Sequence, residues 1–387
     1  MQNKQSIRYE KRLIAFLDIL GFEKIIKKSA NNAGEVATIH KLLHDAANHA
    51  SLPRNYKFKH LKIDINKYIT WNFSDTVTIS CPFESFDYLN FIVGWVEIFQ
   101  HLMWDKHSAF LRGGIAYGNL YDDEEMIFGP ALIKAYDIER EKAVWPRVII
   151  HNSVIKKLSP ETINKSLDEN FRQDNNGLFY VDYLRDLFHI YHVRKSELAL
   201  KKRDENIRVI TESPDPIEFL RCHKSKVEME LTNYGTSKSK NQRILAKYQS
   251  LAEYHNLIIE LFSTTLLDLI NNKNLLREIF TDTMSGGLIS EYKLKHKLGS
   301  SSHPYVMQLI AKYKPKYTAE NSEYSDLMPL LGIAMDIVFD KHHETLDSMD
   351  NPDQIVEFLC QKTPEHISAL FTVMNGLKIN LSNSLLN

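Results

Sequence analysis

Residues 13–23, LIAFLDILGFE, place a single carboxylate, Asp18, inside a run that is otherwise almost entirely apolar. A run of this kind predicts a buried strand, and a lone carboxylate inside it is costly unless a partner compensates its charge. Gly21 ends the run, and the pattern becomes helical from Phe22 onward. Asp18 therefore lies at the end of a strand, where it either caps the following helix or belongs to a binding site.

The first half of the chain alternates between strand and helix patterns. After the strand at 13–18, helical spacing extends to about residue 52, and the order of elements that follows is β-α-β-β-α-β with additions. This order predicts an α+β fold with a ferredoxin-like core that ends near residue 195. The further expected elements are a hairpin in 67–81 that turns at Ser74-Asp75, helices at 86–107, 129–142 and 152–158, strands at 109–117 and 147–150, a turn over GNLYDDEE (118–125), and a last strand at the sheet edge, 177–184.

The second half has a different character. Residues 194–243 are charged and interrupted, whereas 242–263 follow a helical spacing and 264–387 are mostly helical, with loops expected near 284–287, 298–304 and 351–353. We therefore expect a catalytic domain over 1–195 and a mainly helical extension over 196–387. The sequence does not indicate a role for the extension.

Composition excludes several classes of partner. The formal net charge is −1, so no overall field attracts nucleic acid or an anionic membrane, and the basic runs at 194–203 and 237–243 are expected to be solvated faces. The three cysteines are far apart in sequence, which is typical of a reducing compartment. The start of the chain has no apolar signal core, and no segment reaches the roughly 18 apolar residues of a membrane span. We expect a cytoplasmic protein that binds neither nucleic acid nor membrane.

Two carboxylates are expected to meet in the first half. Asp18 ends one strand and Asp75 lies at the tip of a hairpin that would be its neighbour in a ferredoxin-like sheet. Paired carboxylates suit hard divalent cations such as Mg²⁺, which fills its remaining positions with water and substrate phosphates. The N–H groups of Leu20, Gly21 and Phe22 open a helix, and helix N-termini attract phosphate. Taken alone, Asp75 is an ordinary turn residue.

Four motifs occur in an order that points to a known family. FLDILGF (16–22), NFSDTV (72–77), LRGGIAYG (111–118) and GPALIKAYDIE (129–139) resemble, in order, the metal motifs, the R-x-G strand and the following helix of class III nucleotidyl cyclases. Their detailed form is similar to the pyrimidine cyclases of bacterial antiphage defence, the Pycsar cyclases, and KYQSLAEYHN (247–256) also looks like a segment of that branch. The resemblance covers mainly residues 12–150.

The resemblance implies a two-metal mechanism. Asp18 and Asp75 would hold two Mg²⁺ or Mn²⁺ ions, with the carbonyl of Ile19 as a further ligand. One ion would lower the pKa of the ribose 3′-hydroxyl, and the other would steady the triphosphate and the leaving diphosphate. The family's site is shared across a head-to-tail homodimer, so the helix at 129–140 would serve the site of the partner subunit.

The position that selects the base in this family, four residues before the second metal aspartate, holds Trp71. An indole fills pocket volume and offers a flat face and one N–H donor, which favours a pyrimidine over a purine. Within the branch that this chain resembles, Trp at this position goes with CTP and Tyr with UTP. The indole N–H could serve an acceptor on either base, so UTP stays open, and Trp71 could instead be a core residue.

The sequence departs from the purine-type cyclases on the helix at 129–142. Their ribose-binding Asn and transition-state Arg are replaced here by Ile133 and Asp137. Another cation must then neutralise the developing charge. Arg112, Lys134 and Arg140 are candidates, and Arg112 and Lys134 are the catalytic residues we predict, although Arg112 could simply pair with a surface acid.

The predicted function is therefore a nucleotide cyclase that makes 3′,5′-cyclic CMP from CTP, as a second messenger for a separate effector in antiphage defence. The alternatives are a cyclase that makes cyclic UMP, a purine cyclase, which Trp71 disfavours, and a cyclase-like module that binds a nucleotide without turning it over. Two other groups, DDEE (122–125) and KHHE (341–344), are expected to be solvated surface rather than metal ligands.

Overall fold

The chain divides into two compact units, Met1–Tyr183 and Leu184–Asn387, and each is described by itself. The predicted boundary near residue 195 falls outside the described residues. The computed structural model describes residues 7–30, 32–55, 63–123, 125–169, 171–185, 187, 215–235, 242–285, 327–349 and 351–381.

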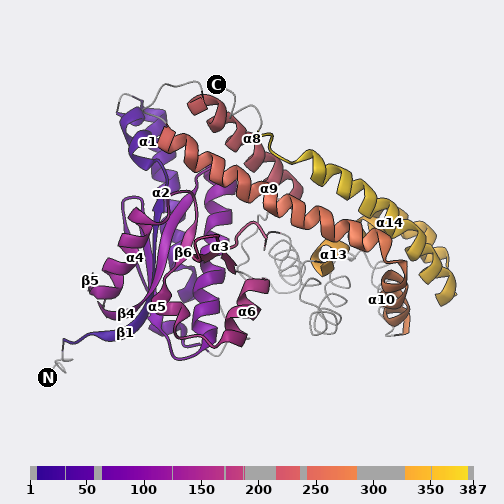
Figure 1. Cartoon of the computed structure of the whole chain (residues 1–387), viewed down its shortest axis with the longest axis horizontal. Coiled ribbons are helices and arrows are strands. Elements are labelled where there is room, and N and C mark those ends of the chain that lie inside the picture. Colours follow the sequence, from indigo (N-terminus) through magenta and orange to yellow (C-terminus); the bar gives the residue numbers. More distant parts are fainter. Residues whose placement is uncertain are drawn as a thin grey trace. The chain divides into compact units, whose positions relative to one another are not determined.

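The first unit is an α+β structure (Figure 1), as the sequence predicts at that level. Within its described residues, eight strands form a mixed sheet in the order β2-β3-β1-β4-β6-β8-β7, and β5 pairs with β4. The elements in chain order are β1 (Glu10–Ile19), α1 (Phe22–Ser29), α2 (Ala33–Asn55), the short 3-10 helix η1 (Ile65–Lys67), β2 (Ile69–Phe73), β3 (Thr76–Pro82), α3 (Phe86–His107), β4 (Leu111–Asp122), β5 (Ile127–Phe128), α4 (Pro130–Glu141), β6 (Val148–Ile150), α5 (Asn152–Ile155), α6 (Pro160–Glu169), β7 (Phe171–Gln173) and β8 (Phe179–Val181).

Alternation along β1 divides the core between two faces of the sheet. Leu13, Ala15 and Leu17 belong to the larger apolar cluster, which includes α2 and α3, whereas Ile14 and Phe16 pack with α4. Because successive side chains of a strand point to opposite faces, Arg12 and Asp18 lie on the α4 face with Ile14 and Phe16. Arg112 and Trp71, which are part of the candidate site described below, lie on the same face as Asp18.

Most predicted elements of this unit are confirmed, and three expectations need correction. The predicted turn over 118–125 is not a turn throughout, because β4 continues to Asp122 and pairs with both β1 and β5. The predicted edge strand at 177–184 contains β8, which lies between β6 and β7, so the edge is formed by β7 instead. The helix predicted at 152–158 is only the four residues of α5.

The described part of the second unit is helical, as predicted. Helix α9 packs against α8 and α14, and α13 and α10 also pack against α14. Between α8 and α9, the rings of His223 and His255 stack with centroids 5.0 Å apart, and His255 Nε2 lies 3.0 Å from the carbonyl oxygen of Leu377. The helices are α8 (Pro216–Gly235), α9 (Gln242–Asn271), α10 (Lys273–Ser285), α13 (Leu327–Ser348) and α14 (Pro352–Gly376).

Some sequence expectations cannot be compared with structure. Helix α8 occupies part of the region expected to be charged and interrupted, but the basic run at 194–203, most of the run at 237–243 and the loop expected near 298–304 lie outside the described residues. Among the residues that are described, no helix has both the length and the apolar character needed to cross a membrane.

Candidate active site

Asp18 and Asp75 lie at the same end of neighbouring strands. Strands β1 and β3 are antiparallel and pair Asp18 with Thr76, the residue directly after Asp75. Asp75 itself lies in the hairpin turn after Ser74, whose φ of 55° is a left-handed turn conformation. Asp75 is close enough to Asp18 to raise the pKa of its carboxyl by like-charge repulsion. The sequence-predicted pair is therefore brought together.

Arg112 lies between two carboxylates. On β4 it is paired with Asp18, and its Nε and Nη2 both donate to Asp18 Oδ2 at 3.1 Å. Its Nη2 also lies 2.6 Å from Glu139 Oε1, which comes from α4. Glu139 is only 4% exposed. The site thus contains a third acid, Glu139, that the sequence analysis did not single out.

The acids around Asp18 outnumber the cations. Burial raises the pKa of Asp18 to about 7, Arg112 acts to lower it, and Glu139 and Asp75 raise it further. A divalent cation between Asp18 and Asp75 would remove this repulsion, so the donor set fits Mg²⁺ or Mn²⁺. Two carboxylates suffice for Mg²⁺ together with substrate, and the described residues contain no group of three or more metal-type side chains.

The turn after β1 supplies fewer free donors than predicted. Gly21 caps α1 with φ 82° and ψ 12°, a left-handed conformation that favours glycine. The N–H of Leu20 donates to the carbonyl of Phe110 at 2.9 Å, so it is already engaged. The expectation of a phosphate cradle therefore depends on Gly21 and Phe22, at the N-terminus of α1. Ile19, whose carbonyl was predicted as a metal ligand, is the last residue of β1 and pairs with Leu111.

Trp71 lies on the same face of the sheet as Asp18. It pairs with Thr78 on β3, which in turn pairs with Phe16 on β1. Two residues along the strands and two strands across separate Trp71 from Asp18, so their Cα atoms are about 12 Å apart. This is the span of a nucleotide from its phosphates to its base. Trp71 is half-buried.

The indole N–H of Trp71 is not free, which the sequence did not predict. Trp71 Nε1 donates to Asp122 Oδ1 at 3.1 Å. The Asp122 side chain is fully buried, so its assignment to a solvated turn is wrong. The sequence does carry a signal that β4 extends this far. Gly118, Leu120 and Asp122 continue the two-residue period of the strand, so they are expected on one face of it.

Lys134 lies apart from the acids. Its Nζ is close to Gly118, where a Cβ atom would be 3.7 Å away. Gly118 is six residues along β4 from Arg112, which corresponds to about 20 Å. Within one chain, Lys134 therefore does not reach the Asp18 carboxylate, and the two predicted catalytic cations, Arg112 and Lys134, are not brought together.

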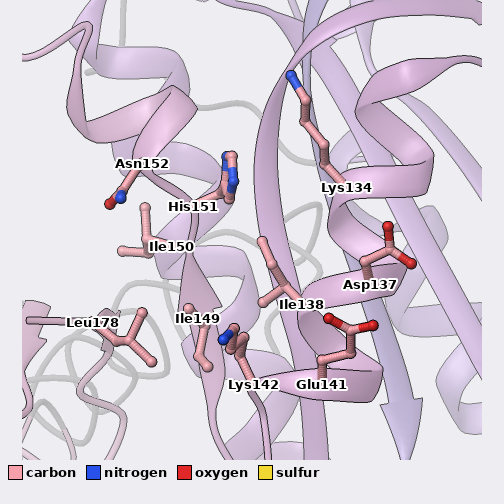
Figure 2. A pocket seen from close by; sticks show the side chains of 10 residues that line it. All are labelled: Lys134, Asp137, Ile138, Glu141, Lys142, Ile149, Ile150, His151, Asn152 and Leu178. Carbon is pink, nitrogen blue, oxygen red and sulfur yellow. The ribbon is translucent and has the colours of Figure 1, made fainter. Parts of the chain in front are cut away.

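Lys134 borders a pocket of about 300 Å³. Figure 2 shows its side chain, which comes from α4, across the pocket from Ile149 and Ile150 at the end of β6. His151, at the far side of this pocket, caps α5 by accepting from the Ser153 N–H, and burial together with Lys134 lowers the pKa of its imidazole. The residues lining the pocket are Lys134, Asp137, Ile138, Glu141, Lys142, Ile149, Ile150, His151, Asn152 and Leu178.

Helix α4 presents apolar side chains to solvent. Ile133 is 60% exposed, and Tyr136 is 43% exposed. At the tip of β2, Phe73 is 84% exposed. Large apolar side chains exposed on one unit are typical of a surface that another chain covers.

No protein-family model matches the sequence, and no curated protein matches it. The functional assignment therefore depends on the residues of the site and on the motifs that carry the resemblance.

Proposed function

We propose that this chain is a nucleotide cyclase that converts CTP to 3′,5′-cyclic CMP and diphosphate. The observation that carries the proposal is the placement of Asp18 and Asp75 at adjacent strand ends, with Trp71 on the same sheet face one nucleotide length away. The acids suit a metal-bound triphosphate, and the flat indole suits a small base.

The topology supports a cyclase-like core. Strands β1 to β4 are adjacent in the order β2-β3-β1-β4, and all three neighbouring pairs are antiparallel. Helices α1 and α2 follow β1, and α3 follows β3. This is the order expected for a ferredoxin-like β-α-β-β-α-β unit, which we include in the proposal.

Asp18 and Asp75 are the residues that would hold two Mg²⁺ or Mn²⁺ ions, with the Ile19 carbonyl as a further donor. When bound there, the ions supply Lewis-acid activation of the 3′-hydroxyl and charge neutralisation on the triphosphate. Gly21 and Phe22 direct the N-terminus of α1 toward the phosphates. Asp18 must be ionised for this role, and its raised pKa makes ionisation depend on pH near neutrality.

Arg112 is the cation next to Asp18, and Glu139 forms an ion pair with it. Arg112 offers five donors in a planar fork, which suits phosphate oxygens as well as carboxylates. Glu139 contacts Nη2, which also donates to Asp18, so the guanidinium keeps a carboxylate partner if Asp18 turns toward another partner. We assign the stabilisation of the developing charge on the α-phosphate to Arg112 and the positioning of Arg112 to Glu139.

A second protomer is part of the proposal. Lys134 is about 20 Å along β4 from Arg112, so it can act on a triphosphate only in the site of another chain. The exposed Ile133 and Tyr136 on the same helix, and Phe73 on the hairpin, are available for such a contact. A head-to-tail homodimer would bring α4 of one subunit to the Asp18–Asp75 end of its partner.

The biological role that we propose is synthesis of a cytoplasmic second messenger in antiphage defence, read by a separate effector that binds the cyclic nucleotide. UTP is the alternative substrate, because Trp71 accommodates both pyrimidines. A module that binds a nucleotide without turnover is a further alternative, which the substitutions at Ile133 and Asp137 favour. A purine substrate is disfavoured by the bulk of Trp71.

The proposal is tested by incubating the full-length protein with each of CTP, UTP, ATP and GTP plus Mn²⁺ and detecting cyclic products by mass. We expect cyclic CMP as the main product and a loss of at least about 100-fold in Asp75→Ala, because a metal ligand is removed. Asp64→Asn, which alters an exposed acid before η1, is the matched control. If no triphosphate gives a cyclic product, the proposed cyclase activity is wrong. If ATP is the preferred substrate, the proposed role of Trp71 in base selection is wrong.

A further inference from the structure

A closed polar network lies under Trp71, and the mechanism above does not use it. Asp122 accepts from Trp71 Nε1 through Oδ1 and from the Ser80 hydroxyl through Oδ2. Arg12 Nε lies 3.7 Å from Asp122 Oδ2 and also donates to Ser80 Oγ at 3.1 Å. Arg12 Nη2 donates to the carbonyl of Lys67 at 2.8 Å.

The network is rigid because its charged groups are buried. The Asp122 side chain has no exposed surface, the Arg12 side chain is 7% exposed, and Ser80 is fully buried. Buried charges are stable only when they are paired and hydrogen-bonded, so each member restricts the others to one arrangement. The network anchors β2, β3 and the end of β4 to β1.

This arrangement fixes what Trp71 can offer to a ligand. An indole has one polar atom, Nε1, and here that atom donates to the buried carboxylate of Asp122. The ring can therefore present only its flat apolar face to a base. The bulk of the ring cannot swing aside without breaking a hydrogen bond to a buried carboxylate.

We propose that Asp122 is the positioning residue that sets base selection, by locking the Trp71 indole with its N–H turned away from the base. The pocket then distinguishes a pyrimidine from a purine by the fixed place of the ring, and the indole N–H takes no part in choosing between CTP and UTP. The inference rests on the proposed function, and it adds a residue and a mechanism of selectivity to it.

The test compares kcat and KM for CTP, UTP and ATP in two variants and a control. Asp122→Asn keeps an oxygen that can accept from Trp71, whereas Asp122→Leu has a similar volume and no acceptor. For Asp122→Leu we expect a rise in the KM for CTP, a smaller change in kcat, and at least an approximately 10-fold fall in the CTP-to-ATP ratio of kcat/KM. The CTP-to-UTP ratio should stay within about 3-fold, and Asp122→Asn should retain most of the CTP-to-ATP selectivity.

The neighbouring acid provides a matched control. Asp123 is partly exposed, and it accepts from the Tyr121 hydroxyl and from the N–H groups of Glu125 and Met126, whereas Trp71 donates to Asp122. Asp123→Asn should leave both ratios of kcat/KM, CTP to ATP and CTP to UTP, unchanged. Because Asp122→Leu leaves Arg12 buried without its partner, Arg12→Met/Asp122→Leu, which removes both charges, replaces it if the single variant does not fold.

Fluorescence reports the contact without turnover. The chain has four tryptophans, so the Trp71 signal is taken as the difference between each protein and its Trp71→Phe counterpart. Burial raises the pKa of Asp122 to about 6, and protonation weakens it as an acceptor, so the Trp71 signal should change with a midpoint near pH 6. Asp122→Asn should abolish that midpoint and Asp123→Asn should keep it.

The outcomes separate the inference from the proposed function. One outcome is that the wild type makes no cyclic product, CTP quenches Trp71 fluorescence more strongly than ATP does, and Asp122→Leu removes this difference. The proposed cyclase activity is then wrong, and the positioning role of Asp122 is supported. If product forms and the folded Asp122→Leu protein keeps its CTP-to-ATP ratio, the positioning role fails alone. If no cyclic product forms and no nucleotide alters Trp71 fluorescence, both are wrong; if product forms without any change in Trp71 fluorescence, the positioning role alone is wrong.

Discussion

At the scale of single residues, the site is organised around an acid whose ionised form is poorly accommodated by the metal-free protein. Burial and the neighbouring acids Glu139 and Asp75 act against ionisation of Asp18, and Arg112 offsets only part of this effect. Such a group is a disadvantage for stability and an advantage for binding a cation. The two consequences have opposite signs, so they can be measured separately.

Replacing Asp18 by Asn should stabilise the metal-free protein above pH 7. Burial raises the pKa of Asp18 to about 7 in the folded state, whereas in the unfolded chain the pKa has its ordinary value of 3.8. Stability contributed by this group therefore falls as pH rises from about 4 to 7 and stays low above that range. At pH 8 with EDTA we expect Asp18→Asn to raise the Tm of the first unit by roughly 3–6 °C, or about 1.5 kcal/mol.

The same variant should show little gain at pH 5, where the wild-type carboxyl is already protonated. Added Mn²⁺ should raise the Tm of the wild type and not that of Asp18→Asn, because the variant has lost a ligand. The measurement is thermal unfolding at pH 5 and pH 8, with and without Mn²⁺, which gives four Tm values for each of the two proteins. A variant less stable than the wild type at pH 8 without metal would mean that the Arg112 ion pair outweighs the burial of Asp18.

The sequence could identify those site residues that lie where a predicted strand ends. Asp18 and Asp75 were found because a polar residue interrupts or ends an apolar pattern, and antiparallel pairing then brings the two together. Glu139 and Asp122 were missed because their burial depends on packing of α4 and on the length of β4. No local pattern distinguishes a buried acid on a helix from an exposed one.

At the scale of elements, β4 decides the geometry of the site. It pairs with β1 along ten residues, carries Arg112 at one end and Asp122 at the other, and supports α4 on one face. The sequence predicted the strand but ended it at 117, because Gly118 and Asn119 are typical turn residues. Pairing with β1 and β5 overrides that local preference, which is a tertiary effect that propensity cannot show.

Gly114 is a point of close approach between β4 and α4, and enlarging it should separate them. A Cβ atom there would lie 2.6 Å from the carbonyl oxygen of Ala135 and 3.0 Å from two atoms of the Ile138 side chain. Since the helix backbone cannot yield, Gly114→Ala should destabilise the first unit by about 2–3 kcal/mol in urea unfolding. It should also lower activity, because Glu139 on α4 would shift away from Arg112.

Gly94 provides the matched control for this substitution. It lies inside α3, and a Cβ atom there would meet nothing within 4 Å. Gly94→Ala should therefore stabilise the unit by about 0.5–1 kcal/mol, because alanine loses less conformational entropy in a helix than glycine does. Equal effects of the two substitutions would show that the close approach at Gly114 does not determine stability.

At the scale of the whole molecule, the two parts of the proposed site, the metal-binding acids and Lys134, lie far apart within one chain. Asp18, Asp75 and Arg112 lie at one end of the β1–β4 ladder, whereas Lys134 lies beside Gly118 toward the other. The sequence indicated two domains but could not show this separation, because it follows from the direction of α4 along β4. A site completed by a second subunit makes a prediction that a monomeric site does not.

Two inactive variants should restore activity to each other when they share a dimer. Asp75→Ala damages the metal end of a site, and Lys134→Ala damages the helix that a partner supplies. Random mixing gives heterodimers in half of the population, and each heterodimer has one intact site of two, so co-expression should recover about a quarter of wild-type activity. The measurement is the rate of cyclic CMP formation by heterodimers purified through two different affinity tags, where recovery should approach one half.

The control pair is Asp18→Asn with Asp75→Ala, both of which damage the metal end. Their heterodimer has a defective metal end in each of its two sites, so no arrangement of subunits yields an intact one. It should therefore stay inactive, while the Asp75→Ala/Lys134→Ala pair regains activity. If neither pair recovers although both dimerise, Lys134 acts in the site of its own chain, and the head-to-tail arrangement is wrong. If Lys134→Ala alone keeps full activity, Lys134 is not catalytic, and the cation that completes the transition state is Arg112.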